Sequence, residues 1–354
     1  MCIKYTWGSF FWRAYDMKRF TSIARLVVFT LAALGVIAFC TLGCKPSEKQ
    51  AGPREKITIA YSTTPNAILV YIAFAKGYFL EEGLDAIPQV HPFGKIALNA
   101  VVEGKADLGT VADTPIVFTV MNGQKIAILA TTQTSNRNEA IIARRDRGIA
   151  KPADLKGKKI GVPFGTHADF FTDIFLIAHG IDREKVKTID IKPDEIATAL
   201  VTGRVDAVSI FDPALTLLKK KLGEKGVFFF GESLYTEEMC VVAMQDYVKM
   251  HPEAIKKVLR ALIKAETFVE QNPEEARRLV AEFIKIDKAL LDEIWPDFDT
   301  MVTLDQSLLV DLEIQSRWAL KNRLMTRKTI PNYLDFIYMD GLLAVKPEAV
   351  SILR

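Results

Sequence analysis

The chain has 354 residues, 49% of them hydrophobic and 25% charged, with 46 lysines and arginines against 43 aspartates and glutamates. This length allows two domains with a substantial core. Residues 1–44 hold five of the basic side chains and one acidic side chain, so the remainder is close to neutral. It shows no basic surface of the kind that binds nucleic acid, and we expect no nucleic-acid partner.

The N-terminal segment has the pattern of an export signal. Basic residues between Lys18 and Arg25 precede an uncharged apolar stretch that runs to Cys44. A basic segment followed by an apolar one is typical of secretion signals, and Met17 fits the start of this one better than Met1. About 18 apolar residues also just suffice to span a bilayer, so an uncleaved membrane anchor is the alternative. Both interpretations place the rest of the chain outside the cytoplasmic membrane.

The end of this stretch, Thr41-Leu42-Gly43-Cys44, resembles the lipobox of bacterial lipoproteins, in which the Cys becomes the acylated N-terminus. Thr41 and Leu42 differ from the usual lipobox residues. The resemblance implies a signal peptide over 1–44, lipidation of Cys44 and a polar tether over 45–55. Cys240 lies in an apolar strand, so we expect it to be buried core without a disulfide.

Two similar segments organise the rest of the chain: Gly-Lys-Ala-Asp-Leu-Gly-Thr-Val-Ala-Asp-Thr-Pro at 104–115 and Gly-Arg-Val-Asp-Ala-Val-Ser-Ile-Phe-Asp-Pro at 203–213. Each starts with a Gly after an apolar helical stretch, where Gly can adopt the left-handed conformation that ends a helix. Each continues with an Asp that opens a short strand and ends with an Asp shortly before a Pro, which is typical of a helix start. The repeat predicts two similar α/β lobes with a ligand between them.

The order of elements repeats as well. A strand at 56–61, a turn at 62–66 and a helix at 67–76 open the first lobe, and a strand at 159–163 with a helix at 168–179 opens the second. Strand-like segments at 139–144 and 239–244 connect the lobes, and such a double connection can act as a hinge. Apolar residues with helical spacing follow from Pro252 onward. We therefore expect the lobes to have these limits: 56–143 with 238–354 for the first, and 144–237 for the second.

Five short motifs, in this order and at this spacing, carry a resemblance to a known family: 75–84 (Ala-Lys-Gly-Tyr-Phe-Leu-Glu-Glu-Gly-Leu), 103–109, 154–163, 203–207 and 272–276. The chain resembles the substrate-binding proteins of ABC importers of the nitrate, sulfonate and taurine group, which includes binders of thiamine pyrimidine precursors. The resemblance covers nearly all of 56–340. It implies the α/β two-lobed periplasmic binding protein fold (type II), with two crossover strands and a cleft between the lobes.

The expected ligand site follows from helix N-termini, whose unpaired N–H groups and positive dipole ends favour anions. Four such termini are expected at the cleft, and Gln133 follows a strand that ends there. The predicted ligand-binding residues are Ser62, Thr63, Thr64, Asn66, Asp113, Thr114, Gln133, Gly165, Thr166, His167, Phe211 and Asp212. The alternative for each small polar residue is that it only caps its own helix.

Asp113 and Asp212 bear on the ligand's charge. If they face the cleft, the ligand carries an amine or a protonated ring nitrogen, because carboxylates repel a plain oxyanion. If they only cap helices, they say nothing about the ligand. The four histidines lie far apart without the spacing of metal ligands, and we expect no metal and no cofactor.

These observations together indicate a binding protein and not an enzyme. We expect the solute-binding component of an ABC importer, a monomer that closes on a sulfonate- or taurine-like ligand and delivers it to a permease with its ATPase. Alternative ligands are a thiamine pyrimidine precursor, nitrate or bicarbonate. A stand-alone sensor and an enzyme of pyrimidine synthesis that shares this fold are less favoured functions; the enzyme's cysteine-rich motif is not in this sequence.

Overall fold

The computed structural model describes residues 54–231 and 234–353, which all belong to one compact unit. The expected signal peptide, Cys44 and all of the tether before Arg54 lie outside these residues. No helix in the described ranges is both long and apolar enough to cross a membrane.

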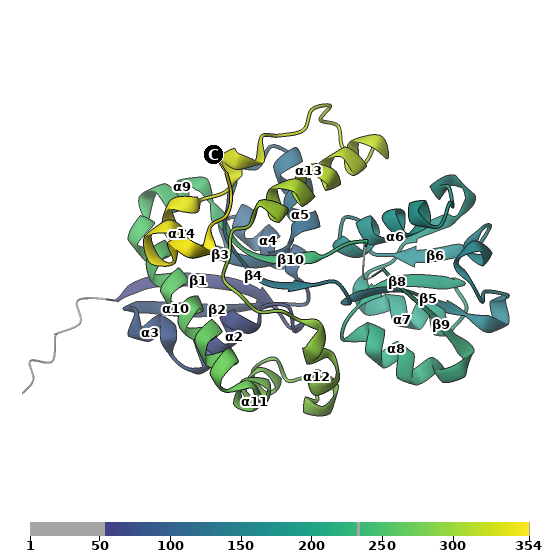
Figure 1. Cartoon of the computed structure of the whole chain (residues 1–354), viewed down its shortest axis with the longest axis horizontal. Coiled ribbons are helices and arrows are strands. Elements are labelled where there is room, and N and C mark those ends of the chain that lie inside the picture. Colours follow the sequence, from purple (N-terminus) through teal and green to yellow (C-terminus); the bar gives the residue numbers. More distant parts are fainter. Residues whose placement is uncertain (1–53, 232–233, 354) are drawn as a thin grey trace, which may run out of the picture. The chain divides into compact units, whose positions relative to one another are not determined.

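Two five-stranded sheets, each covered by helices, form two lobes (Figure 1). The first sheet has the order β2-β1-β3-β10-β4, with β1 (Glu55–Ser62), β2 (Leu84–His91), β3 (Leu108–Ala112), β4 (Ile126–Ser135) and β10 (Glu237–Met244). The second has the order β7-β6-β8-β5-β9, with β5 (Glu139–Arg144), β6 (Lys159–Val162), β7 (Lys187–Asp190), β8 (Ala207–Phe211) and β9 (Gly226–Phe230).

The two sheets are built in the same way. The first three strands in each order are parallel, and the fourth strand, β10 or β5, is antiparallel to the strand on either side of it. In both sheets this fourth strand is the one that enters from the other lobe. The expected α/β fold with two lobes and two crossings is confirmed.

The first crossing lies earlier than the sequence suggests. The sequence pattern assigns residues 139–143 to the first lobe, whereas β5 pairs with β8 and β9 of the second sheet, so the crossing occupies 136–138. An apolar strand that is buried on both faces carries no sign of which sheet it joins, and its neighbours alone decide this.

The repeated segments have one structural role in both lobes. Gly104 and Gly203 have φ values of 69° and 78°, the left-handed conformation expected after α4 (Gly94–Val102) and α7 (Pro193–Val201). The Asp that follows each Gly then holds the neighbouring parallel strand. Asp107 Oδ2 accepts from the N–H of Thr58 at 2.7 Å, and Asp206 Oδ2 accepts from the N–H of Lys159 at 2.9 Å.

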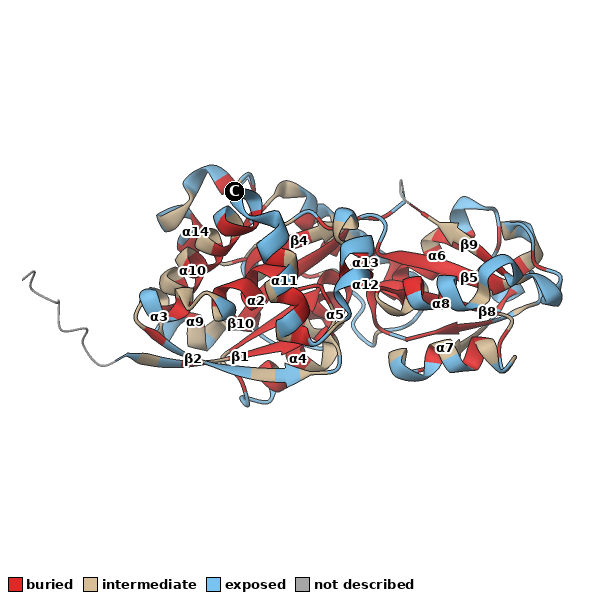
Figure 2. Cartoon of the chain, turned by 90° about the horizontal axis from the view of Figure 1, so that it is seen from below, coloured by how far each residue is buried: buried red, intermediate tan, exposed pale blue. Residues whose placement is uncertain are grey.

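The remaining helices cover the sheets, and the residues between the layers are buried (Figure 2). On the second lobe these are α6 (His167–Ala178) and α8 (Ala214–Leu222). On the first they are α2 (Ile68–Ala75), α3 (Tyr78–Glu81), α5 (Asp113–Met121), α9 (Gln245–Met250), α10 (Pro252–Gln271), α11 (Pro273–Ile284), α12 (Lys288–Ile294), α13 (Gln306–Lys321) and α14 (Met339–Val345). As expected, the helices after Pro252 enlarge the first lobe, because α10 and α11 pack on α2 and α13 packs on α5.

Tyr71 of α2 connects this core to the turn after β1. Its ring is fully buried against Tyr61 and Phe283, with ring centroids 5.5 and 5.6 Å away. Its hydroxyl donates to the backbone oxygens of Ser62 at 2.9 Å and Thr64 at 2.6 Å. One hydroxyl group therefore holds the backbone of this turn at both Ser62 and Thr64.

We expect Tyr71→Phe to lower the free energy of unfolding by about 1–2 kcal/mol, because two backbone carbonyl oxygens, that of Ser62 buried and that of Thr64 partly buried, lose their donor while the packing of the ring is kept. Chemical denaturation followed by circular dichroism measures the change. Tyr78→Phe, at a half-buried ring of the same lobe, is the control and should change stability by less than about 0.5 kcal/mol. Equal effects of the two substitutions would contradict this role for Tyr71.

Candidate ligand-binding cleft

Three helices from two lobes begin at one small cavity of about 20 Å³. α4 and α5 reach it from the first lobe and α6 from the second. Its lining residues are Asn66, Phe93, Gly94, Lys95, Ala112, Pro115, Thr166, His167 and Phe211. Gly94 allows the close approach of α4 to β3, since a Cβ there would lie 3.2 Å from the backbone oxygen of Thr110. The positive dipole ends of three helices thus meet at one place.

Lys95 adds a cation at the same cavity. The backbone of Lys95 belongs to the first lobe, and its Nζ donates to the backbone oxygen of Phe164 in the second lobe at 3.0 Å. A Cβ on Gly165 would lie 2.8 Å from this Nζ, so glycine leaves room for the contact. Burial lowers the pKa of Lys95, against the opposite effect of Asp190 and Asp169. Lys95 was not among the residues predicted from the sequence, although Pro-Phe-Gly-Lys after a strand marks a further helix start at 92–95.

Of the predicted site residues, Asn66, Thr166, His167 and Phe211 line the cavity. Ser62 lies directly behind Asn66 and donates to its Oδ1 at 2.8 Å, and it also contacts the Oγ1 of Thr64 at 2.7 Å. Thr63 is exposed next to this pair. The Oγ1 of Thr166 donates to the backbone oxygen of Pro163 at 2.7 Å.

Other predicted donors are engaged within the protein. The Nε2 of Gln133 donates to the backbone oxygen of Pro65 at 3.1 Å, and the Oγ1 of Thr114 donates to Gln315 at 2.6 Å. The N–H groups of Thr114 and Gly165, which lie at helix starts, donate to Asp113 Oδ1 and Asp169 Oδ2. We infer that these groups shape the cleft and do not themselves reach an anion in this conformation.

Asp113 and Asp212 are both buried, and neither lines the cavity. Asp113 accepts hydrogen bonds from Tyr235, from Gln315 Nε2 at 2.7 Å and from the N–H of Thr114. Burial raises its pKa to about 7. Asp212 Oδ1 accepts from the N–H of Thr216 at 2.9 Å in the first turn of α8. These contacts favour the capping interpretation of both aspartates.

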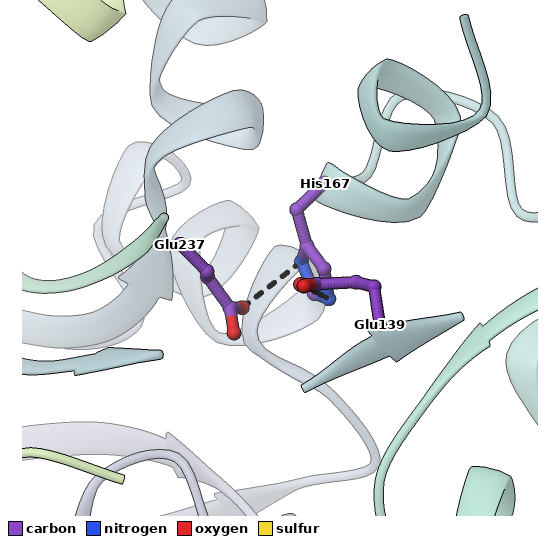
Figure 3. A group of neighbouring side chains, drawn as sticks. All are labelled: Glu139, His167 and Glu237. Atoms are coloured by element: carbon purple, nitrogen blue, oxygen red, sulfur yellow. Dashed lines mark ion pairs between the residues drawn. The ribbon is translucent and has the colours of Figure 1, made fainter. Parts of the chain in front are cut away.

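A different pair of carboxylates, Glu139 and Glu237, lies against the ring of His167 (Figure 3). Glu237 Oε1 lies 3.2 Å from the ring Nδ1 of His167, and Glu139 Oε1 lies 3.4 Å from its Nε2. The three side chains are 1%, 3% and 5% exposed for Glu237, Glu139 and His167. The ring of Phe211 packs against His167 with 4.5 Å between the ring centroids. We call Glu139, His167 and Glu237 the hinge cluster, because both glutamates are the first residues of strands that follow a crossing.

The hinge cluster places three titratable groups where burial disfavours their charged forms. Burial, followed by the charge of Glu237, raises the pKa of Glu139 well above its ordinary value. Burial also raises the pKa of Glu237 to about 8 and lowers the pKa of His167. Neither glutamate was predicted from the sequence. The available signal was a glutamate that opens a largely apolar strand, once at 139 and once at 237.

Two lobes joined by two crossings, with a cavity lined from both, are the architecture of two-lobed solute-binding proteins. Residues 64–276 match the model of the NMT1/THI5-like family, and the chain belongs to that family. It is a binding protein and not an enzyme.

Individual proteins support this assignment. A binding protein of Brucella abortus strain 2308, whose name gives no ligand, is 31% identical over 227 residues, covering 62% of this chain and 69% of that protein. The taurine-binding periplasmic protein of Escherichia coli K12 is 26% identical over 256 residues, covering 69% and 72%. The structure of the alkanesulfonate-binding protein SsuA from Xanthomonas axonopodis, bound to MOPS, shares the fold with a TM-score of 0.71 at 18% identity, covering 81% and 99%.

The raised pKa of Asp212, about 6, gives a testable pH dependence. Burial is its main cause, so the folded state holds the proton more tightly than the unfolded chain does. The stabilisation is complete below about pH 4 and is lost as the pH rises through about 6. Asp212→Asn keeps an acceptor for the N–H of Thr216 and removes the titration. Between pH 4 and pH 8, we expect the stability of this variant relative to the wild type to rise by roughly 2–3 kcal/mol.

Urea unfolding at a series of pH values measures this difference. Asp182→Asn, at an exposed position of the same lobe, is the control and should follow the wild-type curve. Parallel curves for Asp212→Asn and the wild type would show that Asp212 does not titrate in this way.

Proposed function

We propose that the protein is the solute-binding component of an ABC importer and captures a small anionic or zwitterionic solute of the sulfonate or taurine type. The observation that carries this proposal is the convergence of three helix N-termini and Lys95 on one cavity lined from both lobes. A sulfonate or carboxylate group offers the acceptors and the charge that such a site favours. The taurine-binding relative and the alkanesulfonate-binding structure support the same solute class.

Closure of the lobes supplies the affinity. Besides Lys95, contacts across the lobes include Trp318 Nε1, which donates to Asp173 Oδ2 at 2.5 Å, and the pair Lys220–Glu293 at 2.6 Å. Closure removes water from the cavity, and hydrogen bonds to a charged group then contribute about 1.5–3 kcal/mol each. Micromolar affinity requires about −8 kcal/mol, so a few such bonds suffice. The closed form is the one that we propose is presented to the permease and its ATPase.

An amino-pyrimidine is the second candidate ligand. Phe93 and Phe211 both line the cavity and can pack against a flat ring. The buried carboxylates of the hinge cluster can accept hydrogen bonds from amino groups or from a protonated ring nitrogen. A ring compound of this kind would bind in the same cavity, next to His167 of the hinge cluster.

The proposal includes the position of the protein in the cell. Cleavage before Cys44 and acylation of this residue would anchor a monomer to the outer side of the membrane through the tether at 45–55. The permease and ATPase would then receive the solute from a protein held close to them. Mass analysis of the protein purified from a bacterial membrane would reveal a diacyl- or triacyl-modified Cys44 and a missing segment before it.

We expect a taurine-like or alkanesulfonate solute to raise the melting temperature of the full-length chain purified in detergent. A solute at a hundred times its Kd stabilises the folded state by about 2.7 kcal/mol. Lys95→Met should weaken the binding of an anion about 10- to 100-fold, because it removes one charged hydrogen-bond donor. Lys105→Met, at an exposed lysine of the same lobe, is the matched control and should bind like the wild type.

The panel contains taurine, alkanesulfonates, nitrate, bicarbonate and amino-pyrimidines. Stabilisation by amino-pyrimidines alone would replace the main proposal by the second candidate. Stabilisation by sulfonates to the same extent in Lys95→Met and the wild type would contradict the assigned role of Lys95.

A further inference from the structure

The hinge cluster contains three buried atoms that lack a hydrogen-bond partner within the described part of the chain. These atoms are Glu139 Oε1, His167 Nε2 and Glu237 Oε1, because the contacts of 3.2 and 3.4 Å between the carboxylates and the imidazole ring do not have hydrogen-bond geometry. The cluster's nitrogen and oxygen ligand atoms, one from each side chain, lie within 4.8 Å of one another. Buried polar atoms are nearly always paired, because leaving one without a partner costs roughly 1–3 kcal/mol. Three such atoms at one point therefore indicate that the cluster is built for a further group.

The chemistry of the three side chains indicates which group this is. Two carboxylates and a neutral imidazole offer lone pairs to one centre and repel one another when nothing lies between them. A divalent transition-metal cation accepts lone pairs from this set of donors, at about 2.0–2.2 Å from each nitrogen or oxygen. One nitrogen and two carboxylate ligands leave a further coordination position open, as in metal sites that bind an exchangeable ligand.

The surroundings of the cluster hold its side chains in place. Asn138 Nδ2 donates to the second oxygen of Glu237 at 2.5 Å, which orients this carboxylate as outer hydrogen bonds do in metal sites. The ring of Phe211 covers one side of His167. His167 is fixed at the first position of α6, while the two glutamates start β5 and β10. The donors thus come from three elements that meet where the chain crosses between the lobes.

We propose that Glu139, His167 and Glu237 bind one divalent transition-metal cation of the Zn²⁺ or Mn²⁺ type. His167 also lines the cavity, so this cation lies beside the place where the solute binds. The metal places positive charge beside the cavity, which favours an anionic solute. The proposed metal binding does not depend on the proposed function, whereas the proposed effect of the metal on the affinity for the solute does.

The test uses the full-length chain, freed of metal with EDTA and titrated with ZnCl₂ or MnCl₂ by calorimetry. We expect one cation per chain, with a Kd in the micromolar range or below. Glu139→Gln and Glu237→Gln keep the size of the side chain, and each should weaken binding at least tenfold.

Glu238→Gln is the matched control. Glu238 is the next residue in β10, and its buried carboxylate already accepts from Thr131 at 2.7 Å and from Ser307 at 3.3 Å. Circular dichroism melting curves establish that each variant is folded. Absence of stoichiometric binding of both metals to the wild type would overturn the proposal. Equal binding by the wild type and both cluster variants would overturn it as well, because the metal would then lie elsewhere.

A second titration separates this inference from the proposed function. Taurine and alkanesulfonates are added with and without the bound metal, and we expect tighter binding with metal by tenfold or more. Metal binding with an unchanged solute affinity overturns the link between the two ligands and leaves the cation site standing. Metal binding without stabilisation by any member of the solute panel supports the cation site and contradicts the proposed function.

Discussion

The double crossing of the chain is the constraint on which the rest of the structure depends. Each sheet takes its fourth strand from the other lobe, and this strand runs antiparallel to its neighbours. The parallel strands of both lobes therefore point toward the crossings, and the helices that follow them start there. α4, α5 and α6 open at one cavity because the two similar lobes are joined in this way. The helix N-termini, which favour an anion, therefore meet at one place because of the topology of the chain.

The same constraint gathers acidic side chains. The turns at the crossings bring Glu139, Glu237 and the aspartate of α5 into one buried region, against Lys95 at the rim of the cavity. Buried carboxylates are retained at a cost in stability, which is why such groups cluster at functional sites. Hydrogen bonds from Tyr235, Gln315 and a backbone N–H offset the free-energy cost of burying the carboxylate of Asp113. Among the described residues, the hinge cluster has fewer hydrogen-bond donors than Asp113. We infer from this difference that Asp113 has a structural role, whereas the hinge cluster binds a ligand.

Much of the fold could be predicted from the sequence, because its signals are local. Gly104 and Gly203 end helices with positive φ, and their following aspartates bind the neighbouring strands in both lobes, as a repeated pattern requires. The motifs that carried the family resemblance lie on such scaffold positions. The limit of the first lobe was placed too late because strand pairing is a long-range property, and β5 has no residue that reveals its partners.

The site was harder to predict for the same reason. Phe211 and His167 were predicted because they adjoin helix starts, and they line the cavity, whereas Asp113 and Asp212 have the same sequence signal and turn inward to the protein. Which way a capping carboxylate points depends on partners such as Gln315, about two hundred residues away. Glu139 and Glu237 gain their importance only from each other and from His167, three positions that no window of sequence contains.

The small size of the cavity has a kinetic consequence. A space of about 20 Å³ holds roughly one water molecule, and every solute considered above is larger than that. No such solute enters the closed form, so capture must proceed through an open one, and the association rate is limited by how often the lobes are apart. Contacts such as that of Trp318 with Asp173, which hold the lobes together, slow capture and release alike. The strength of these contacts between the lobes sets how long the solute stays bound before the protein meets a transporter.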